Sequence, residues 1–383
     1  MNILFNMGSL KKGGAERVAS NLCNFLVKDN DISIMTSIKE NSYYKLNNNI
    51  NLYNLDENRP EKNFLKKNIK RLKKMNLLVK KIKPDIIISF LPEPSYRILF
   101  LKIFNPNIKV IVSVRNDPKV EYSSIKNRMI MKLLYPLADG FVFQTQEAKE
   151  YFSKKIQDKS VIIPNPINEE FICEPYTGKR EKIIVTVGRL EKQKNHKMLI
   201  EAFSKLPEEL NEYKLIIYGE GSLRPELEKQ IKELNLSDRV FLPGQVDDIK
   251  NKIYKASLFV LSSDYEGMPN ALMEAMALGI PCISTDCPCG GPRFLICSNK
   301  NGILVKINNS EKMENKIEYI LKNENIRNKM GREAIKIRED LNPDNINNEW
   351  KKFAIYTKDK RWINDRHIHN ISNNNFYYYS IFC

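Results

Sequence analysis

Short apolar segments alternate with amphipathic helices along this chain, and that alternation constrains its fold more than any other feature. The segments are rich in β-branched residues, and each is followed by a turn and then a helix. They include residues 2–7, 84–91, 108–114, 182–187 and 213–218. Strands that are apolar on both faces indicate parallel sheets covered by helices. Because 383 residues are too many for one ordinary core, we expect two Rossmann-like α/β domains.

The segment DYEGMPNALMEAMALGIP, Asp264 to Pro281, predicts a loop followed by a short helix with two glutamates. The helix should open at Pro269, where no backbone N–H is needed, and close at Gly279. Glu266 then lies in the preceding loop and Glu274 inside the helix. The positive end of a helix binds anions and sugar hydroxyls, so ligand-binding residues are expected here: Gly267, Met268, Pro269 and Asn270. A capped core helix with two solvated glutamates is the plainer alternative.

Two other turns place glycines or cations beside a helix start. After the first strand, Gly13 and Gly14 permit close approach to a phosphate, although the turn lacks the GxGxxG pattern and a structural turn is the alternative. Arg189 and Lys194 lie in the loop after strand 182–187. Separately, each would be an ordinary surface charge.

The net charge of +16 is concentrated in the first 170 residues and predicts an anionic partner there. Nucleic acid, anionic lipid and diphosphate substrates all qualify, but no nucleic-acid reader module is present, so we do not expect nucleic acid. No uninterrupted apolar run is long enough to span a membrane, and the start MNILFNMGSL lacks the features of a signal peptide. Seven cysteines without framework or zinc spacing suggest buried thiols in the cytoplasm, and no metal.

Residues 64–83 predict one amphipathic helix with an apolar stripe and a strongly basic remainder from Lys66 to Lys83. The stripe consists of Leu65, Ile69, Leu72, Leu78 or Val79, and Ile82. The helix could simply pack on its sheet with a solvated basic face. Alternatively, that basic face also rests on an anionic membrane surface. Both interpretations stay open at this point. Residues 39–64 give no confident element.

Three segments together resemble glycosyltransferase family 4: EGMPNALMEAMALGIP with its E-x7-E spacing, VGRLEKQKN upstream, and GGAERV near the start. The resemblance covers roughly Met1 to Trp350. It implies the GT-B fold, in which two Rossmann-like domains face each other across a cleft. It also implies retaining transfer of a sugar from a nucleotide-sugar donor, with no cofactor.

The resemblance also implies roles for particular residues. Arg189 and Lys194 would clamp the donor diphosphate, and Glu266, with the amides of residues 267–270, would hold the sugar. Glu274 would hold ribose hydroxyls. Gly13 and Gly14 would face the diphosphate and the acceptor. The remaining donor contacts would come from Gly219 and from the base-binding loop: Phe241, Gly244 and Val246.

The chain departs from the family pattern in two places. Many members carry a His in the loop at residues 115–118, where this chain has Asn116 and Asp117 as candidate ligand residues. Phe294 stands where the family's GPRE motif has Glu. Gly290, Gly291 and Arg293 would line the cleft or form a plain turn.

These observations predict an acceptor domain at 1–168, a hinge at 169–181 and a donor domain at 182–342. A helix at 343–357 would cross back, and 358–383 would be a disordered tail. We expect metal-independent transfer of a hexose or N-acetylhexosamine, UDP-linked, to a polyprenyl-diphosphate-linked or other glycan. The work would take place in the cytoplasm, on the inner face of the cell membrane. The alternative is a non-catalytic GT-B subunit that recruits a lipid-linked substrate, which loss of Arg189, Lys194 or either Glu would have indicated.

Overall fold

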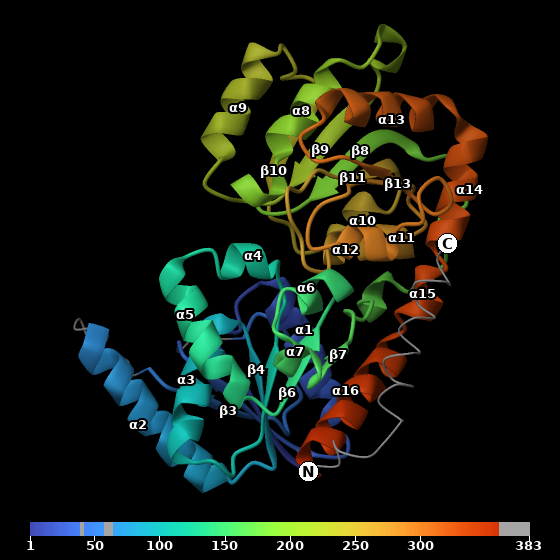
Figure 1. The fold of residues 1–383 in the computed structure, drawn as a ribbon. Coiled ribbons are helices and arrows are strands. Elements are labelled where there is room, and N and C mark those ends of the chain that lie inside the picture. The colour runs from blue at the N-terminus through green and yellow to red at the C-terminus, as the bar shows by residue number, and fades with distance from the viewer. Residues whose placement is uncertain (39–41, 57–63, 360–383) are drawn as a thin grey trace. The chain divides into compact units, whose positions relative to one another are not determined.

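The structure is a computed structural model that describes residues 1–38, 42–56 and 64–359. They form two compact units, each built on one parallel sheet (Figure 1). Among the described residues, unit 1 comprises Met1–Pro166 and residues 344–359, which form the last described helix, and unit 2 comprises Ile167–Pro343. Two Rossmann-like units are what the alternating pattern predicts. The tail beyond residue 359 lies outside the described residues.

Unit 1 has a seven-stranded sheet in the order β3-β2-β1-β4-β5-β6-β7. All its pairings are parallel, and β1 pairs with β2 without a register shift. Its elements are β1 (Asn2–Met7), α1 (Gly14–Leu26), β2 (Asp31–Thr36), β3 (Asn51–Asn54), α2 (Phe64–Ile82), β4 (Ile86–Phe90), α3 (Pro92–Phe104), β5 (Val110–Ser113), α4 (Pro118–Glu121), α5 (Ile125–Leu134), β6 (Gly140–Phe143), α6 (Gln146–Glu150), α7 (Lys154–Gln157), β7 (Ser160–Ile162) and α16 (Pro343–Lys358).

Unit 2 has a six-stranded parallel sheet in the order β10-β9-β8-β11-β12-β13. Its elements are β8 (Glu181–Val187), α8 (His196–Ser204), β9 (Lys214–Tyr218), α9 (Arg224–Glu233), β10 (Val240–Gly244), α10 (Ile249–Ile253), β11 (Ala256–Leu261), α11 (Asn270–Ala277), β12 (Cys282–Thr285), α12 (Gly291–Leu295), β13 (Ile303–Val305), α13 (Ser310–Lys322), α14 (Glu324–Ala334) and α15 (Ile337–Asp340).

Helix α16 is part of unit 1 although it lies at the far end of the described chain. Trp350 is buried and stacks on Phe90 of β4, with ring centroids 5.9 Å apart. Phe353 packs so close to Gly140 that a Cβ on this glycine would lie 2.9 Å from its ring. Buried aromatic area of this kind contributes roughly 2 kcal/mol or more per side chain. This packing ties the end of the chain to the first sheet.

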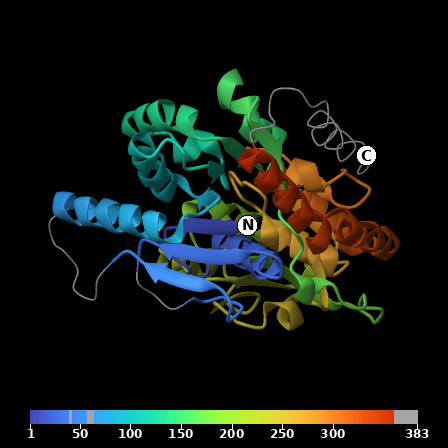
Figure 2. The same ribbon diagram turned by 90° about the horizontal axis from the view of Figure 1, so that it is seen from below.

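Helices α2, α3 and α5 cover one side of the unit 1 sheet, and α16 lies across from them (Figures 1 and 2). Helix α3 contacts both α2 and α5. The side of α2 that is buried comprises Arg71, Met75 and Val79, spaced four residues apart. Arg71 donates two hydrogen bonds to the Asp56 carboxylate, at 2.6 and 2.7 Å. Pairing with that carboxylate allows a charged residue to lie on the buried side.

The expectations for this region were met only in part. The predicted apolar stripe of α2 is confirmed at Val79, which is buried, and wrong at Ile69, which is 53% exposed. Leu72, Leu78 and Ile82 are half-buried. The periodicity alone could not reveal that an arginine with a carboxylate partner takes the buried position. Strand β3 was also missed in the Asn-rich segment, because its residues NLYN are exposed or half-buried and pair only with β2.

Candidate active site

Four loops of unit 2 meet at the carboxyl edge of its sheet. They follow β8, β9, β11 and β12, which run parallel. From β8 the strand order continues to β9 and β10 on one side, whereas β11, β12 and β13 follow on the other. The order therefore reverses between β8 and β11, and this is where open α/β sheets bind ligands. The loops of Lys194 and Glu266 flank this reversal.

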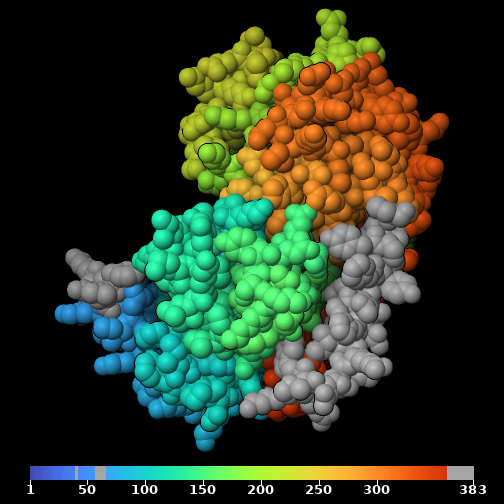
Figure 3. Space-filling view, viewed as in Figure 1, coloured from blue at the N-terminus to red at the C-terminus, as the bar shows by residue number. Residues whose placement is uncertain are grey.

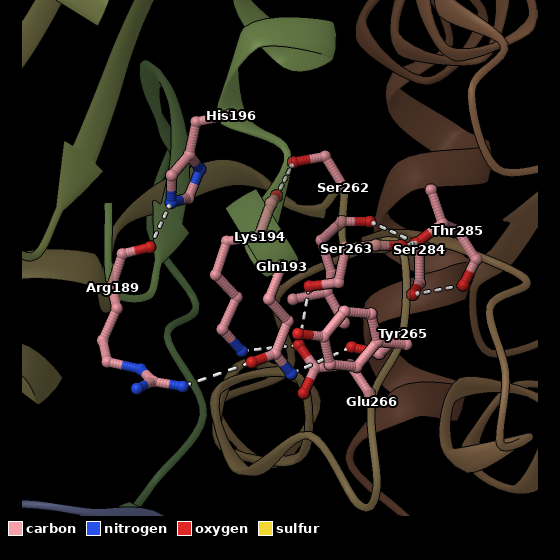
Figure 4. A network of polar contacts seen from close by, with 11 residues as sticks. Arg189, Gln193, Lys194, His196, Ser262, Ser263, Tyr265, Glu266, Ser284 and Thr285 are labelled. Carbon is pink, nitrogen blue, oxygen red and sulfur yellow. Dashed lines mark hydrogen bonds and ion pairs between the residues drawn. The ribbon is translucent and has the colours of Figure 1, made fainter. Parts of the chain in front are cut away.

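Lys194 and Glu266 form an ion pair at the reversal, with 2.5 Å between Nζ and Oε1 (Figure 4). The Glu266 side chain is only 7% exposed and that of Lys194 only 16%. Ser263 donates a hydrogen bond to the same carboxylate oxygen at 2.6 Å. A buried carboxylate that has a cation and a hydroxyl donor is satisfied, so the geometry of this pair is fixed before any ligand arrives.

The loops that carry this pair are tied together by further hydrogen bonds. The Asp264 amide donates to the Gln193 carbonyl at 2.9 Å. The Gln193 side chain donates to the Tyr265 carbonyl at 3.0 Å, and the Ser262 hydroxyl donates to the Lys194 carbonyl at 2.8 Å (Figure 4). Gln193 and the two residues before Asp264 were not singled out from the sequence. Their role is to position the loops, and no local pattern marks it.

Arg189 lies in the same loop as Lys194, but its partner is a neutral amide and not a carboxylate. One guanidinium N–H donates to the Gln193 side-chain carbonyl at 3.2 Å (Figure 4). Among the described residues, no carboxylate lies within ion-pair distance of Arg189. The guanidinium therefore has donors left for a planar anionic ligand.

His196 begins α8 and is buried directly behind this loop. One ring nitrogen, Nε2, lies 3.2 Å from the Arg189 carbonyl, and Nδ1 has no hydrogen-bond partner in the part of the chain that the structure describes. Burial lowers the pKa of this imidazole to about 4, and the nearby Lys194 charge contributes to the shift. His196 is therefore neutral at pH 7, and its Nε2–H donates to the backbone carbonyl of Arg189.

Glycines let these loops approach one another closely. A Cβ on Gly291 would lie 1.7 Å from the Gly267 carbonyl oxygen. A Cβ on Gly219, whose φ is +147°, would lie 2.0 Å from the Gly188 carbonyl oxygen. Both positions require glycine. Gly291 thus holds the loop that precedes α11, and Gly290 with Gly291 starts the short helix α12. The Arg293 charge is paired with Asp286 at 2.9 Å.

Helix α11 runs from Asn270 to Ala277, with Pro269 at its cap, so it starts one residue later than predicted. It ends as expected, because Gly279 has a left-handed φ of +67°. Glu274 lies inside it and is 6% exposed, and Met268 ahead of it is buried to the same degree. The alternative of two solvated glutamates is therefore wrong. A ligand role for Glu274 stays a prediction.

The other predicted donor residues lie on β10 and nearby. Gly244 has a φ of +87° and accepts a hydrogen bond from the Gly219 amide at 2.9 Å. Phe241 is 38% exposed on this edge strand, and the Lys214 ammonium lies 5.6 Å from its ring centroid. An exposed aromatic ring offers a face on which a base could stack. Base binding by Phe241 and Val246 stays a prediction.

In unit 1, the predicted residues Gly13 and Asp117 already have hydrogen-bond partners. The Tyr44 hydroxyl accepts from the Gly13 amide at 3.1 Å and donates to the Gly13 carbonyl at 2.9 Å. Helix α1 starts at Gly14. The Asp117 carboxylate is buried and caps α4 by accepting from the Lys119 amide at 2.9 Å, whereas Asn116 is half-buried. A cap explains why Asp stands at this position.

The sequence did not single out Arg115, which is buried at the carboxyl edge of the first sheet. It donates to the Asn165 side-chain oxygen and lies 5.5 Å from the Phe90 ring centroid. Within the described parts of the chain, no carboxylate pairs with it, and burial lowers its pKa to about 9. An arginine after a buried strand gives no local signal of burial, because that depends on Asn165, fifty residues later.

The two Rossmann-like units, each built on a parallel sheet, define a protein of the GT-B fold. An Anabaena protein, HepE, solved in complex with UDP and glucose, has the same fold: the TM-score is 0.78 at 18% identity, over 92% of this chain and 98% of HepE. Residues 169–337 match the family model for glycosyl transferases group 1, and residues 12–171 match that for glycosyltransferase family 4.

Two relatives from Campylobacter jejuni match most of the chain. An N-acetylgalactosamine-N,N'-diacetylbacillosaminyl-diphospho-undecaprenol 4-alpha-N-acetylgalactosaminyltransferase is 30% identical over 83% of this chain and 90% of its own. The second relative is a GalNAc-alpha-(1->4)-GalNAc-alpha-(1->3)-diNAcBac-PP-undecaprenol alpha-1,4-N-acetyl-D-galactosaminyltransferase. It is 28% identical over 94% of this chain and 99% of its own length. The chain belongs to glycosyltransferase family 4, group 1, and is an enzyme that transfers a sugar. None of its described helices has the length and apolarity to cross a membrane.

Proposed function

We propose that this enzyme moves a hexose or N-acetylhexosamine from a UDP-sugar to a lipid-linked glycan, with retention of anomeric configuration and without a metal ion. The observation that carries the proposal is the Lys194–Glu266 ion pair at the strand reversal of unit 2. The names of the two Campylobacter relatives support a diphosphate-linked acceptor, and the UDP bound to HepE supports a uridine diphosphate donor. The alternative of a non-catalytic subunit is not favoured, because the members of the family are transferases.

In the proposed chemistry, the bond between the anomeric carbon and the diphosphate oxygen breaks. The acceptor hydroxyl attacks the same face, and its proton passes to the leaving phosphate oxygen. No side chain has to act as a nucleophile. Negative charge therefore grows on the diphosphate, and the protein's task is to stabilise it.

We propose that Arg189 and Lys194 supply this stabilisation, and that Arg189 contributes more positive charge than Lys194. Lys194 already shares its charge with Glu266, whereas Arg189 hydrogen-bonds a neutral amide. Glu266, with the helix end at residues 267–270, would hold sugar hydroxyls. Glu274 would hold the ribose. A diphosphate clamped by two cations and a helix end needs no metal for neutralisation.

The donor is tested by a panel of nucleotide sugars with thermal unfolding as readout, because a ligand that binds the folded state raises its stability by mass action. We expect the UDP-sugars to raise the melting temperature more than GDP- or ADP-sugars do. Equal shifts with all three bases would contradict the UDP assignment. A transfer assay with the selected donor then identifies the acceptor.

Turnover tests the clamp. Arg189→Ala should lower kcat about 10²–10³-fold with little change in donor affinity, because its charge matters most as the leaving group develops. Lys179→Ala, an exposed lysine of unit 2, is the control for charge removal. A chelator should leave the rate unchanged. Near-normal turnover of the Arg189 variant would remove the clamp from the mechanism, and strong inhibition by the chelator would overturn the metal-free proposal.

We further propose that α2 rests on an anionic membrane surface through the side that points away from α3. This side carries the exposed lysines Lys66, Lys70, Lys73 and Lys80, and it also exposes Ile69 and Leu77, at 53% and 67%. Lysines with apolar side chains between them suit the boundary between head groups and acyl chains. Such a surface would keep the enzyme at the inner face of the cell membrane, where lipid-linked glycans are found.

A further inference from the structure

A second surface of unit 1 combines a cationic pocket with exposed apolar side chains. The pocket lies between α4, α5 and the end of α6, and its volume is about 410 Å³. It is lined by Lys119, Arg128, Met131, Lys132 and Tyr151. Helices α4 and α6 follow β5 and β6, so the pocket opens near the carboxyl edge of the first sheet, where α/β proteins bind ligands. No sequence motif pointed to it.

The three cations of the pocket are not neutralised by the residues that the structure describes. Among those residues, no carboxylate lies within ion-pair distance of Lys119, Arg128 or Lys132. Arg128 is held in place by the Tyr122 and Ser123 carbonyls, at 3.4 and 3.0 Å. Three like charges around one cavity repel one another unless an anion is present. The arrangement is thus complementary to a ligand with more than one negative charge.

The nearest acidic residue of α4 does not cancel this charge. Glu121 lies near the half-buried Tyr96 and the buried Tyr122: burial raises the pKa of both tyrosines, and the charge of Glu121 contributes to each shift. Burial raises the pKa of Glu121 to about 7, with a further contribution from Asp117. A large part of this carboxyl is therefore neutral at pH 7. The opposite wall of the pocket is Tyr151, which stacks on Tyr122 at 6.1 Å between ring centroids.

The outer side of α5 is apolar and uncovered. Ile125, Met129 and Leu133 are four residues apart and therefore share one face of the helix, and they are 76%, 66% and 74% exposed. The neighbouring helix α3 adds exposed Phe100 and Phe104. Both helices lie on the molecular face that Figure 3 shows in blue-green. A helix of a soluble protein normally buries such a stripe, so its exposure indicates a partner.

We propose that the pocket binds the diphosphate of a polyprenyl-linked acceptor while the α5 apolar stripe, Ile125, Met129 and Leu133, sits in the bilayer interface. The proposal rests on the lipid-linked acceptor suggested above and names the residues that would hold it. Charge decides the occupant: a diphosphate diester carries two negative charges, whereas the phosphodiester of a bulk lipid carries one. Three uncompensated cations match the former better. The polyprenyl chain of this acceptor stays in the membrane, and the adjacent apolar stripe would hold the pocket at the membrane surface beside it.

Vesicle binding tests the occupant without knowledge of the sugar. Phosphatidylcholine vesicles are doped with undecaprenyl diphosphate, undecaprenyl phosphate or phosphatidylglycerol at matched total charge. We expect the full chain to bind the diphosphate vesicles about tenfold more tightly than the other two, since charge-assisted hydrogen bonds add to the general attraction. Inorganic diphosphate should compete. Equal binding to all three vesicles would overturn the proposal, because the surface would then be a general anionic-lipid surface.

Two sets of variants localise the effect. Lys119→Ala with Lys132→Ala should abolish the preference for diphosphate, whereas Lys126→Ala with Lys155→Ala removes the same charge from exposed positions outside the pocket and should keep it. Arg128 is left intact because it holds two backbone carbonyls. Met129→Ser with Leu133→Ser should weaken binding to every vesicle while preserving competition by inorganic diphosphate. Equal loss in the pocket and control pairs would refute the pocket.

An assay of sugar transfer to a short soluble acceptor separates this inference from the proposed function. The pocket variants should transfer to that acceptor at the wild-type rate and lose transfer to the lipid-linked one. If the wild type shows no transfer from any UDP-sugar but still prefers diphosphate vesicles, the proposed function fails and the pocket stands. If transfer occurs and the pocket variants behave as wild type on both acceptors, the pocket fails and the proposed function stands.

Discussion

The carboxyl edge of each sheet holds a cation that is largely removed from solvent, but only one of these two cations has a carboxylate partner among the residues that the structure describes. In unit 2, Lys194 faces the carboxylate of Glu266 at 2.5 Å. In unit 1, Arg115 faces the amide oxygen of Asn165 and the ring of Phe90, and no carboxylate pairs with it among the described residues. The charge of Lys194 is therefore compensated by a carboxylate, whereas Arg115 keeps an uncompensated positive charge in a desolvated place.

This difference indicates what each edge is built to receive. In unit 2, the ion pair holds its side chains in fixed positions, which suits a neutral sugar. Arg189 supplies the further positive charge that a diphosphate needs. An unpaired buried cation is costly, because burial removes its hydration without a counter-charge, and it gains most when an anion arrives. The lysines of the pocket beside α5 add further uncompensated positive charge to unit 1. Under the proposals above, unit 1 would attract an anionic ligand and unit 2 would orient one.

The largest expected effect tests how tightly the two edges are packed. Gly291→Ala should destabilise the protein by about 4 kcal/mol or more and abolish transfer, because its Cβ would lie 1.7 Å from the Gly267 carbonyl. Gly8→Ala, at the carboxyl end of β1, is the matched control, since its Cβ would have 3.9 Å to the nearest atom, on Pro94. Urea denaturation measures both. A comparable loss in the Gly8 variant would show that the unit 1 edge is packed just as tightly.

The second prediction exchanges each cation for an apolar side chain. Lys194→Met should lower the free energy of unfolding by about 3–5 kcal/mol, because it leaves the Glu266 carboxylate buried and unpaired. Adding Glu266→Gln should restore most of that stability without restoring activity. Arg115→Met should cost no more than about 1 kcal/mol, because no described carboxylate loses its partner. If both methionine variants lost the same stability, the contrast between a paired and an unpaired edge would be wrong.

The third prediction uses the pH dependence of the unit 2 edge. The folded pKa of His196, about 4, lies below its ordinary value of 6.5, so the unfolded chain binds more protons between these pH values. Stability should therefore fall as pH drops from 7 to 4, by up to about 3 kcal/mol from this residue. His196→Gln should lack this contribution.

The comparison of wild type with the His196 variant is essential, because other groups act in the opposite direction. Burial raises the pKa of Glu121 and Glu349 to about 7, so their contribution to stability falls as pH rises from 4.5 through 7. Urea denaturation at several pH values gives the difference between the two proteins. Parallel pH profiles would show that His196 titrates normally in the folded state.

The smallest effect concerns the basic side of α2. Reversal of Lys66, Lys70 and Lys73 to Glu should weaken binding to phosphatidylglycerol vesicles by about 1 kcal/mol for each residue that reaches the surface, and rising salt should weaken it further. Lys67 is left intact because it lies 3.6 Å from Asp56 and helps hold the helix. Transfer to a short soluble acceptor should survive. Equal loss on soluble and lipid-linked acceptors would assign α2 to folding.

The sequence by itself determined the two parallel sheets, the positions of most strands and the glutamate-bearing helix. These features are local: apolar β-branched runs, a proline at a helix start and a glycine at its end express preferences of a few neighbouring residues. The loop with Arg189 and Lys194 could also be identified from the sequence, because it belongs to one of the three motifs whose order indicated the family. The sequence could not show that Lys194 pairs with Glu266, because 72 residues separate them.

Only the tertiary structure decided which charges are paired, which glycines are obligatory and which apolar residues stay uncovered. Gly291 has to be glycine because of a carbonyl in another loop, and Arg71 is buried because Asp56 reaches it. In α5 the periodic apolar residues are shared between the core and the surface, which no helical period distinguishes: Met131 and Leu134 are buried, whereas Met129 is exposed. These outcomes depend on which elements pack together, and that is a property of the whole fold.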